Sequence, residues 1–175
     1  GVPSPEIKIN EYPHQQSGGI RQRAMISMAL SFNPILLIAD EPTPALDVTI
    51  QAQVLELMKK LQNDFNTSIL FITHDLGVIA EMCDDVIVMY MGKIVELGNA
   101  NDVYSDPLMP YTKALISAVP IPDPEIELLR ERIVLEGDVP SLVNPGAGCR
   151  FHTRCPYAVP ECQEEIPDLV EIKPN

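Results

Sequence analysis

The chain has 175 residues and a formal net charge of −13, and 46% of its residues are hydrophobic. This hydrophobic content supports a folded core and excludes a wholly disordered chain, while the acidic balance argues against a nucleic-acid partner. No apolar run approaches the roughly 20 residues that cross a bilayer as a helix.

The N-terminal part of the chain predicts a loop, a helix and a strand. Three prolines within residues 1–15 favour a loop. The apolar spacing over residues 19–32 predicts a mostly buried helix, which Asn33-Pro34 ends because the residue before proline avoids helical geometry. The apolar run Ile35–Ala39 is typical of a strand buried on both faces of a parallel sheet.

The middle of the chain continues this alternation. Asp47 is a candidate N-cap for a helix that ends near Asn63 and carries an apolar stripe at helical spacing. The next expected elements are a buried strand, a short helix and two strands joined by a turn, at Ser68–Thr73, Leu76–Cys83, Val86–Tyr90 and Lys93–Glu96. This order indicates an α/β fold.

Beyond Gly98 the character of the chain changes. Short helices are expected at residues 102–104 and 110–119, and residues 120–124 form a linker by composition, with three prolines. Residues 125–175 are rich in proline and acidic side chains, which predicts a small, irregular C-terminal extension.

Two carboxylates, Asp40 and Glu41, directly follow the predicted strand at residues 35–39. Ligands of open α/β sheets bind beyond the carboxyl ends of strands, and two carboxylates there can hold Mg²⁺ and polarise an attacking water. The alternative is a turn-forming or helix-capping role, which a motif of two residues does not exclude.

Two further polar groups precede or follow predicted elements. His74 follows the second strand, so we expect it beside Asp40 and Glu41, where a neutral imidazole can bind a γ-phosphate oxygen or orient water. A lone histidine is more often structural. The Ser17-Gly18-Gly19 segment precedes a helix and can form a phosphate-binding turn, although it is also a common loop sequence.

Three of the four cysteines, Cys149, Cys155 and Cys162, cluster near the C-terminus. With no export signal recognisable in the sequence, such a cluster favours metal binding over disulfides. Three thiolates need a fourth ligand. Cys83 is conceivable, but a cysteine in an apolar helix is usually part of the core. The alternative is three free thiols, or one adventitious disulfide, in a loop-rich tail.

Four motifs in order carry a resemblance. Ser-Gly-Gly-x-Arg-Gln-Arg, Asp-Glu-Pro, Ala-Leu-Asp and Thr-His-Asp, with apolar strands between them, resemble the second half of an ABC-transporter ATPase over residues 12–98. The resemblance implies a P-loop NTPase fold, with a partial parallel sheet and helices in residues 1–105 and an extension in residues 106–175.

The resemblance also implies a role for each motif. Ser17, Gly18 and Gly19 match the signature motif, and Ala45-Leu46-Asp47 matches the D-loop. Asp40 matches the Walker B aspartate that holds Mg²⁺, Glu41 matches the catalytic glutamate, and His74 matches the switch histidine.

In this family two ATPase subunits form a head-to-tail dimer, and the signature of one covers ATP held by the phosphate loop of the other. The implied partners are therefore a second ABC ATPase subunit and transmembrane permeases. The implied location is the cytoplasmic face of the cell membrane, peripheral to it.

Two positions depart from the family pattern. Gln16 stands where Leu is usual, which would weaken packing beneath the signature. Pro44 stands where Ser or Thr is common, which would stiffen the D-loop.

Further segments narrow the resemblance to the dipeptide and oligopeptide importers. They are Tyr12–Gln15, Val88–Glu96, Pro110–Leu115 and Gly148–Ala158. In that subfamily the extension can hold a 4Fe–4S cluster, so Cys149, Cys155 and Cys162 are candidate iron ligands, with zinc as the second candidate metal. In the subfamily, the last cysteine of the cluster comes after a segment that resembles residues 170–175. This chain stops before such a cysteine.

No Gly-x-x-x-x-Gly-Lys sequence followed by Ser or Thr occurs, and the chain begins Gly-Val-Pro without a methionine. We therefore expect a piece of a longer ATP-hydrolysing subunit that energises dipeptide or oligopeptide uptake, and expect this piece to be inactive alone. The alternatives are a non-catalytic fragment or regulatory interaction module, and an ABC ATPase for another cargo such as nickel or a sugar.

Overall fold

The computed structural model describes residues 2, 4–43, 46–121, 123–141, 143 and 145–173. Pro122 of the expected linker and the last two residues of the 170–175 segment lie outside this set. The chain divides into two compact units, Gly1–Asp75 and Leu76–Asn175. The domain boundary that the sequence suggests, between residues 105 and 106, stays a prediction.

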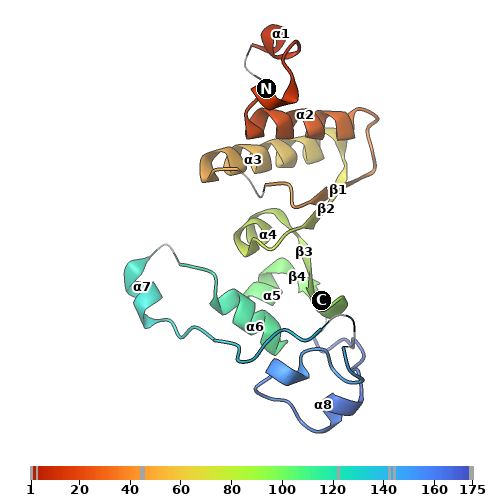
Figure 1. Cartoon of the computed structure of the whole chain (residues 1–175), viewed down its shortest axis with the longest axis vertical. Coiled ribbons are helices and arrows are strands. Elements are labelled where there is room, and N and C mark those ends of the chain that lie inside the picture. The colour runs from red at the N-terminus through yellow and green to blue at the C-terminus, as the bar shows by residue number, and fades with distance from the viewer. Residues whose placement is uncertain are drawn as a thin grey trace. The chain divides into compact units, whose positions relative to one another are not determined.

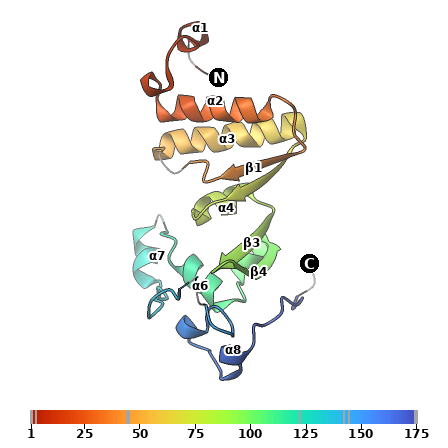
Figure 2. The ribbon, with the colours of Figure 1, turned by 45° about the vertical axis from the view of Figure 1, so that its right-hand side comes forward.

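The first unit consists of two long helices beside a two-stranded parallel sheet (Figures 1 and 2). Its elements are α1 (Pro5–Lys8), the 3₁₀ helix η1 (Pro13–Gln15), α2 (Gly18–Leu30), β1 (Leu36–Asp40), α3 (Val48–Phe65) and β2 (Ser68–Ile72). The strands pair from Leu36 opposite Ser68 to Asp40 opposite Ile72. Side chains from α2, α3, β1 and β2 meet in a small apolar interior, among them Ile26, Met58 and Ile69.

The two strands are not buried on both faces, so that prediction is wrong for the described structure. Leu37 and Ile69 face the helices. Their neighbours point the opposite way, since side chains alternate along a strand. On that side Ile38, Leu70 and Ile72 are 59%, 44% and 47% exposed. The physical reason is that, in the described part of the first unit, helices cover only one face of this sheet.

Helix α2 is also less buried than its apolar content predicts. Only Gly19, Ile26 and Leu30 are buried, while Met25 and Met28 are exposed. The helix packs along one narrow stripe against α3 and the sheet, and the stripe is too narrow to cover every apolar side chain.

The second unit is built on an antiparallel hairpin, as the sequence predicts. Its elements are α4 (Leu76–Met82), β3 (Asp85–Tyr90), β4 (Lys93–Asn99), α5 (Ala100–Ser105), α6 (Pro110–Ser117), α7 (Pro124–Leu129), η2 (His152–Arg154) and α8 (Glu161–Glu164). The strands turn at Met91 and Gly92, which both have positive φ angles. Val86, Val88, Ala100 and Val103 form the hydrophobic core of this unit.

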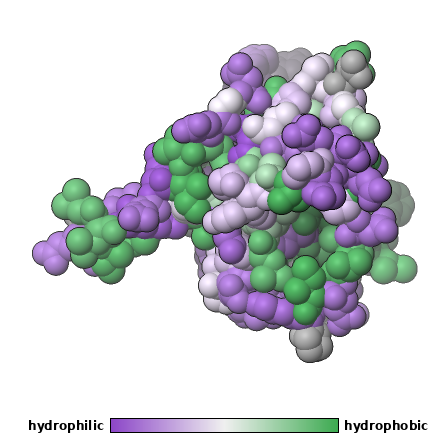
Figure 3. Space-filling view, turned by 90° about the horizontal axis from the view of Figure 1, so that it is seen from below, coloured by the Kyte–Doolittle hydropathy of each residue, from purple (hydrophilic) through white to green (hydrophobic). Residues whose placement is uncertain are grey.

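The C-terminal extension is held to the hairpin by an aromatic cluster. Phe151 is fully buried, and its ring centroid lies 5.2 Å from that of Tyr90 and 5.5 Å from that of Tyr111. By contrast, α7 leaves Leu128 and Leu129 more than four-fifths exposed, and Figure 3 shows apolar groups at this projecting helix. Within the described residues, none of the helices has the length and apolar character needed to span a bilayer.

Candidate functional site

The carboxyl edge of the parallel sheet carries the first group of candidate residues. Asp40 is the last residue of β1, and the backbone N–H of Glu41 donates to the carbonyl of Ile72 at 2.8 Å. Glu41 has a φ of 44°, which is uncommon for a residue with a side chain. The chain therefore turns sharply after the strand while Glu41 stays tied to β2.

Glu41 and His74 are in direct contact. Nδ1 of His74 lies 2.8 Å from Oε1 of Glu41, and the two side chains are 83% and 40% exposed. An ionised carboxylate can only accept, so Nδ1 is the donor. The hydrogen bond and the charge of Glu41, with a smaller contribution from Asp75, raise the pKa of His74 above 6.5. This arrangement leaves Nε2 directed away from the pair and available to a ligand.

Asp40 lies exposed at the same edge, opposite Ile72 in the register. Among the described side chains, no group of three or more His, Cys, Asp or Glu could hold a metal ion. A single carboxylate nevertheless suits Mg²⁺ that arrives with a nucleotide, because Mg²⁺ is commonly held by one or two carboxylates together with substrate phosphates and water.

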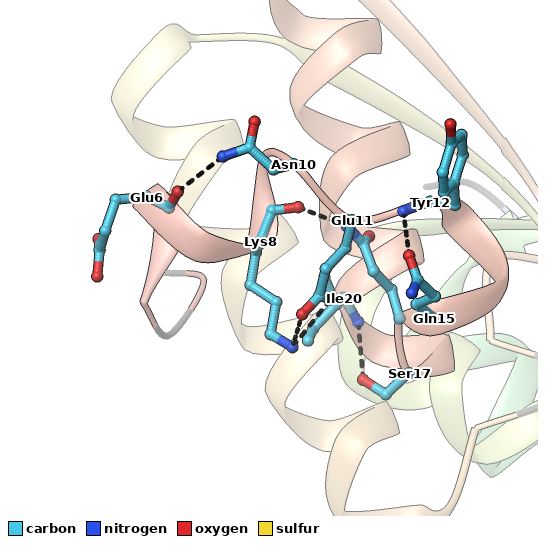
Figure 4. A network of polar contacts seen from close by, with 9 residues as sticks. Glu6, Lys8, Asn10, Glu11, Tyr12, Gln15, Ser17 and Ile20 are labelled. Carbon is cyan, nitrogen blue, oxygen red and sulfur yellow. Dashed lines mark hydrogen bonds and ion pairs between the residues drawn. The ribbon is translucent and has the colours of Figure 1, made fainter.

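The Ser17-Gly18-Gly19 turn begins helix α2. Oγ of Ser17 accepts from the backbone N–H of Ile20 at 3.4 Å, and so caps the helix (Figure 4). Gly19 is buried, and a Cβ there would lie 2.7 Å from Cγ2 of Ile50 on α3. Close packing of the two helices thus requires glycine at this position whether or not an anion binds the turn.

Asp47 caps helix α3, as predicted: its Oδ1 accepts from the backbone N–H of Ile50 at 3.0 Å. The neighbouring Leu46 lies against the Ser17-Gly18-Gly19 turn, since a Cβ on Gly18 would be 3.3 Å from Cδ2 of Leu46. Pro44 and Ala45 lie outside the described residues. The structure thus brings together two pairs of predicted segments, Glu41 with His74 and the glycine turn with the start of α3.

One set of polar contacts in this unit went unassigned in the sequence. Nε2 of Gln51 donates to Oδ2 of Asp75 at 3.0 Å, and the backbone N–H of Asp75 donates to Oγ1 of Thr73 at 3.1 Å. Sequence alone does not distinguish Gln51 from its exposed neighbour Gln53. Gln16, which was expected to weaken packing beneath the turn, donates from Nε2 to the carbonyl of Lys8 at 2.9 Å, so a hydrogen bond holds its side chain.

The cysteines are partly buried free thiols. The backbone N–H of Cys149 donates to the carbonyl of Cys162 at 2.8 Å, which brings these two backbones together. Cys83 packs against the core of the second unit, and burial, followed by the charge of Asp84, raises the pKa of its thiol. Because the described side chains form no metal-holding group of three or more, these residues do not fit an iron–sulfur or zinc site in this structure.

Comparison with known protein families finds a match in the second unit. Residues 95–162 match a family model described as "Oligopeptide/dipeptide transporter, C-terminal region". The matched range includes the C-terminal part of β4 together with the extension that Phe151 holds in place.

Curated relatives match nearly the whole chain. The oligopeptide transport ATP-binding proteins AppF and AppD of Bacillus subtilis are each 54% identical to it, over 94% and 99% of this chain and 50% and 52% of their own lengths. OppF of Salmonella typhimurium, also an oligopeptide transport ATP-binding protein, is 54% identical over 92% of this chain and 48% of its own length. The chain therefore spans about half the length of these relatives.

A solved structure shares part of the fold. CbiO1 from Clostridium perfringens, described as part of the ABC transporter complex CbiONQ, is 32% identical with a TM-score of 0.50. The similarity covers 53% of this chain and 37% of CbiO1.

Proposed function

We propose that this chain supplies two parts of a peptide-importer ATPase: the sheet edge that hydrolyses ATP, with Asp40, Glu41 and His74, and the Ser17-Gly18-Gly19 signature turn. The premise is that the chain is a homologue of oligopeptide-transport ATP-binding subunits and spans about half of their length. The observation that carries the proposal is the contact between Glu41 and His74 at the carboxyl edge of the parallel sheet. The α/β fold is that of ABC ATPases, as the similarity to CbiO1 indicates.

In this proposal each residue at the sheet edge has one task. Glu41 polarises the attacking water, and His74, held through Nδ1, presents Nε2 to the γ-phosphate. Asp40 would hold Mg²⁺, which would stabilise negative charge on the phosphates of bound ATP. The raised pKa of His74 favours the imidazolium, whose second N–H can donate to a phosphate oxygen.

The glycine turn serves a second nucleotide. Ser17, Gly18 and Gly19 stand at the N-terminus of a helix of 13 residues, where backbone N–H groups and the helix dipole favour an anion. The anion is ATP held by a second ATPase subunit in a head-to-tail dimer, and Asp47 lies at the interface with that subunit. The dimer binds the transmembrane permease subunits at the cytoplasmic face of the membrane, as a peripheral component, and its ATP hydrolysis drives peptide uptake.

The experiment that tests this proposal is a chimera. The matching residues of AppF are replaced by this chain, and Mg-ATP hydrolysis is measured for the purified chimera and for the 175-residue chain alone. We expect turnover by the chimera and none by the chain alone, because its sequence holds no lysine-bearing phosphate loop.

Variants of the chimera separate the site from the fold. Glu41→Gln and His74→Ala should abolish turnover, while Glu56→Gln, an exposed carboxylate on α3, should leave it unchanged. A folded chimera that binds ATP but hydrolyses it equally well with and without Glu41 would refute the assigned roles. Turnover by the chain alone, lost with Glu41→Gln, would show that it needs no further segment.

A further inference from the structure

Two side-chain contacts join the loop after β2 to other parts of the first unit. His74 contacts Glu41 through Nδ1, and the next residue, Asp75, accepts a hydrogen bond from Nε2 of Gln51 at 3.0 Å. Inside the loop, the backbone N–H of Asp75 donates to Oγ1 of Thr73 at 3.1 Å. The side chain of His74 is 83% exposed, so little packing holds the ring, and polar contacts set its direction.

Gln51 lies in the first turns of helix α3. Its backbone N–H donates to the carbonyl of Asp47 at 2.8 Å, so it follows the residue that caps the helix by one turn. The same part of α3 contacts the glycine turn through Ile50, whose Cγ2 leaves no room for a Cβ on Gly19. One short stretch of helix therefore contacts both the glycine turn and the His74 loop.

The chemistry of a glutamine suits this position. Its amide donates to the carboxylate of Asp75 without carrying a charge, so the negative charge of Asp75 that favours a protonated His74 is kept. A lysine or arginine would neutralise that charge, and a glutamate would repel it. A leucine would fill similar space but offer no donor.

We propose that Gln51 is a positioning residue, which fixes the loop carrying His74 to the helix that also supports the Ser17-Gly18-Gly19 turn. This inference rests on the proposed function for its significance, since the two segments it joins would then serve two different ATP molecules. Gln51 itself touches neither nucleotide. Gln51 fixes the position of Asp75 by a hydrogen bond, and the position of Asp75 in turn sets the direction of the neighbouring His74 ring.

The test reads the tautomer of His74 by nitrogen NMR on the 175-residue chain, at a pH where the ring is neutral. In the native chain we expect the proton on Nδ1, because Glu41 accepts it. In Gln51→Leu, which keeps a good helix former, the loop loses the hydrogen bond between Gln51 and Asp75. We expect the Nδ1–H form to fall and the amide of Asp75 to exchange roughly tenfold faster.

Two matched variants make the result specific. Gln53→Leu alters the same residue type on the same helix, where the side chain accepts from Arg23 instead, and should leave the His74 signal unchanged. The double change Gln51→Glu with Asp75→Asn reverses the donor and the acceptor, and should restore both signals. The amide signals of Gly18 and Gly19 report whether the helix pair remains folded in every variant.

The proposal would be overturned if Gln51→Leu left both the His74 tautomer and the exchange rate of the Asp75 amide unchanged. It would also be overturned if the double variant Gln51→Glu with Asp75→Asn did not restore them. The measurement needs no nucleotide and no turnover. If the chimera showed no ATP turnover, the NMR result on Gln51 would therefore still be valid. If the NMR result contradicted the role of Gln51, the proposed ATPase function would likewise still be open to its own test.

Discussion

Among individual residues, the pair of Glu41 and His74 combines a short contact with high exposure. Because its pKa in the folded chain is raised, His74 favours the folded state fully below pH 6.5, and this contribution is lost as the pH rises through the raised value. The imidazolium is thus the form in which His74 is held most firmly to the sheet edge.

The corresponding prediction concerns the titration of His74. By NMR, we expect its pKa to lie above 6.5 in the native chain and to return toward 6.5 in Glu41→Gln, because the amide removes both the charge and the best acceptor. Asp64→Asn, at an exposed position near the end of α3, serves as the control. Equal pKa values in the native chain and in Glu41→Gln would show that the pair does not form in solution.

At the scale of elements, the crossing of α2 and α3 depends on one missing side chain. Gly19 is buried, and the Cβ it lacks would lie 2.7 Å from a branched, stiff side chain, that of Ile50. The same crossing places the Ser17-Gly18-Gly19 turn beside Leu46 at the start of α3. Packing alone is therefore a sufficient reason for the second glycine of the motif.

We predict that Gly19→Ala lowers the free energy of unfolding by about 1–3 kcal/mol through overpacking, measured by urea denaturation. Gly18→Ala should cost less, because its Cβ would meet the flexible end of Leu46 at 3.3 Å. Adding Ile50→Ala to Gly19→Ala should remove the clash and recover part of the loss. If Gly19→Ala were as stable as the native chain, the close approach of the helices would be wrong.

Across the whole molecule, the described part of the irregular extension has one buried side chain that packs against the hairpin. Phe151 is the largest fully buried side chain among the described residues, and it packs edge-on against Tyr90 of the hairpin. We predict that Phe151→Ala destabilises the second unit by about 3–5 kcal/mol and exposes residues 145–173 to proteases. Tyr157→Ala, at a position 72% exposed, should change neither property. Equal protease resistance of Phe151→Ala and the native chain would contradict this role.

Sequence patterns predicted the order of elements from α2 to α6, because each depends on local signals. They missed the short helices α1 and η1, in a segment predicted to be a loop, and α7 and α8, in the segment predicted to be irregular. Asp47 and Asn33-Pro34 mark a helix start and a helix end, and the Met91-Gly92 turn joins two strands. The patterns failed on burial: an apolar strand looks the same whether one or two of its faces are covered, and Ile38 and Leu70 proved exposed.

The candidate site was predicted to a similar extent. Chain order along a parallel sheet was enough to expect His74 near Glu41, since both follow neighbouring strands. It was not enough to find Gln51, whose contact with Asp75 depends on how α3 is rotated over the loop. Spacing likewise suggested a common site for Cys149, Cys155 and Cys162, whereas a metal site depends on side-chain directions that spacing does not fix.

The proposed role of Glu41 is to activate water for ATP hydrolysis, and its most direct test is the turnover rate of the AppF chimera at saturating Mg-ATP, with and without Glu41→Gln. Loss of a general base typically costs roughly 10²–10⁴-fold in rate, so we expect turnover to fall by at least about a hundredfold while ATP binding is retained. A Glu41→Gln chimera that binds ATP and hydrolyses it at the native rate would contradict this role of Glu41.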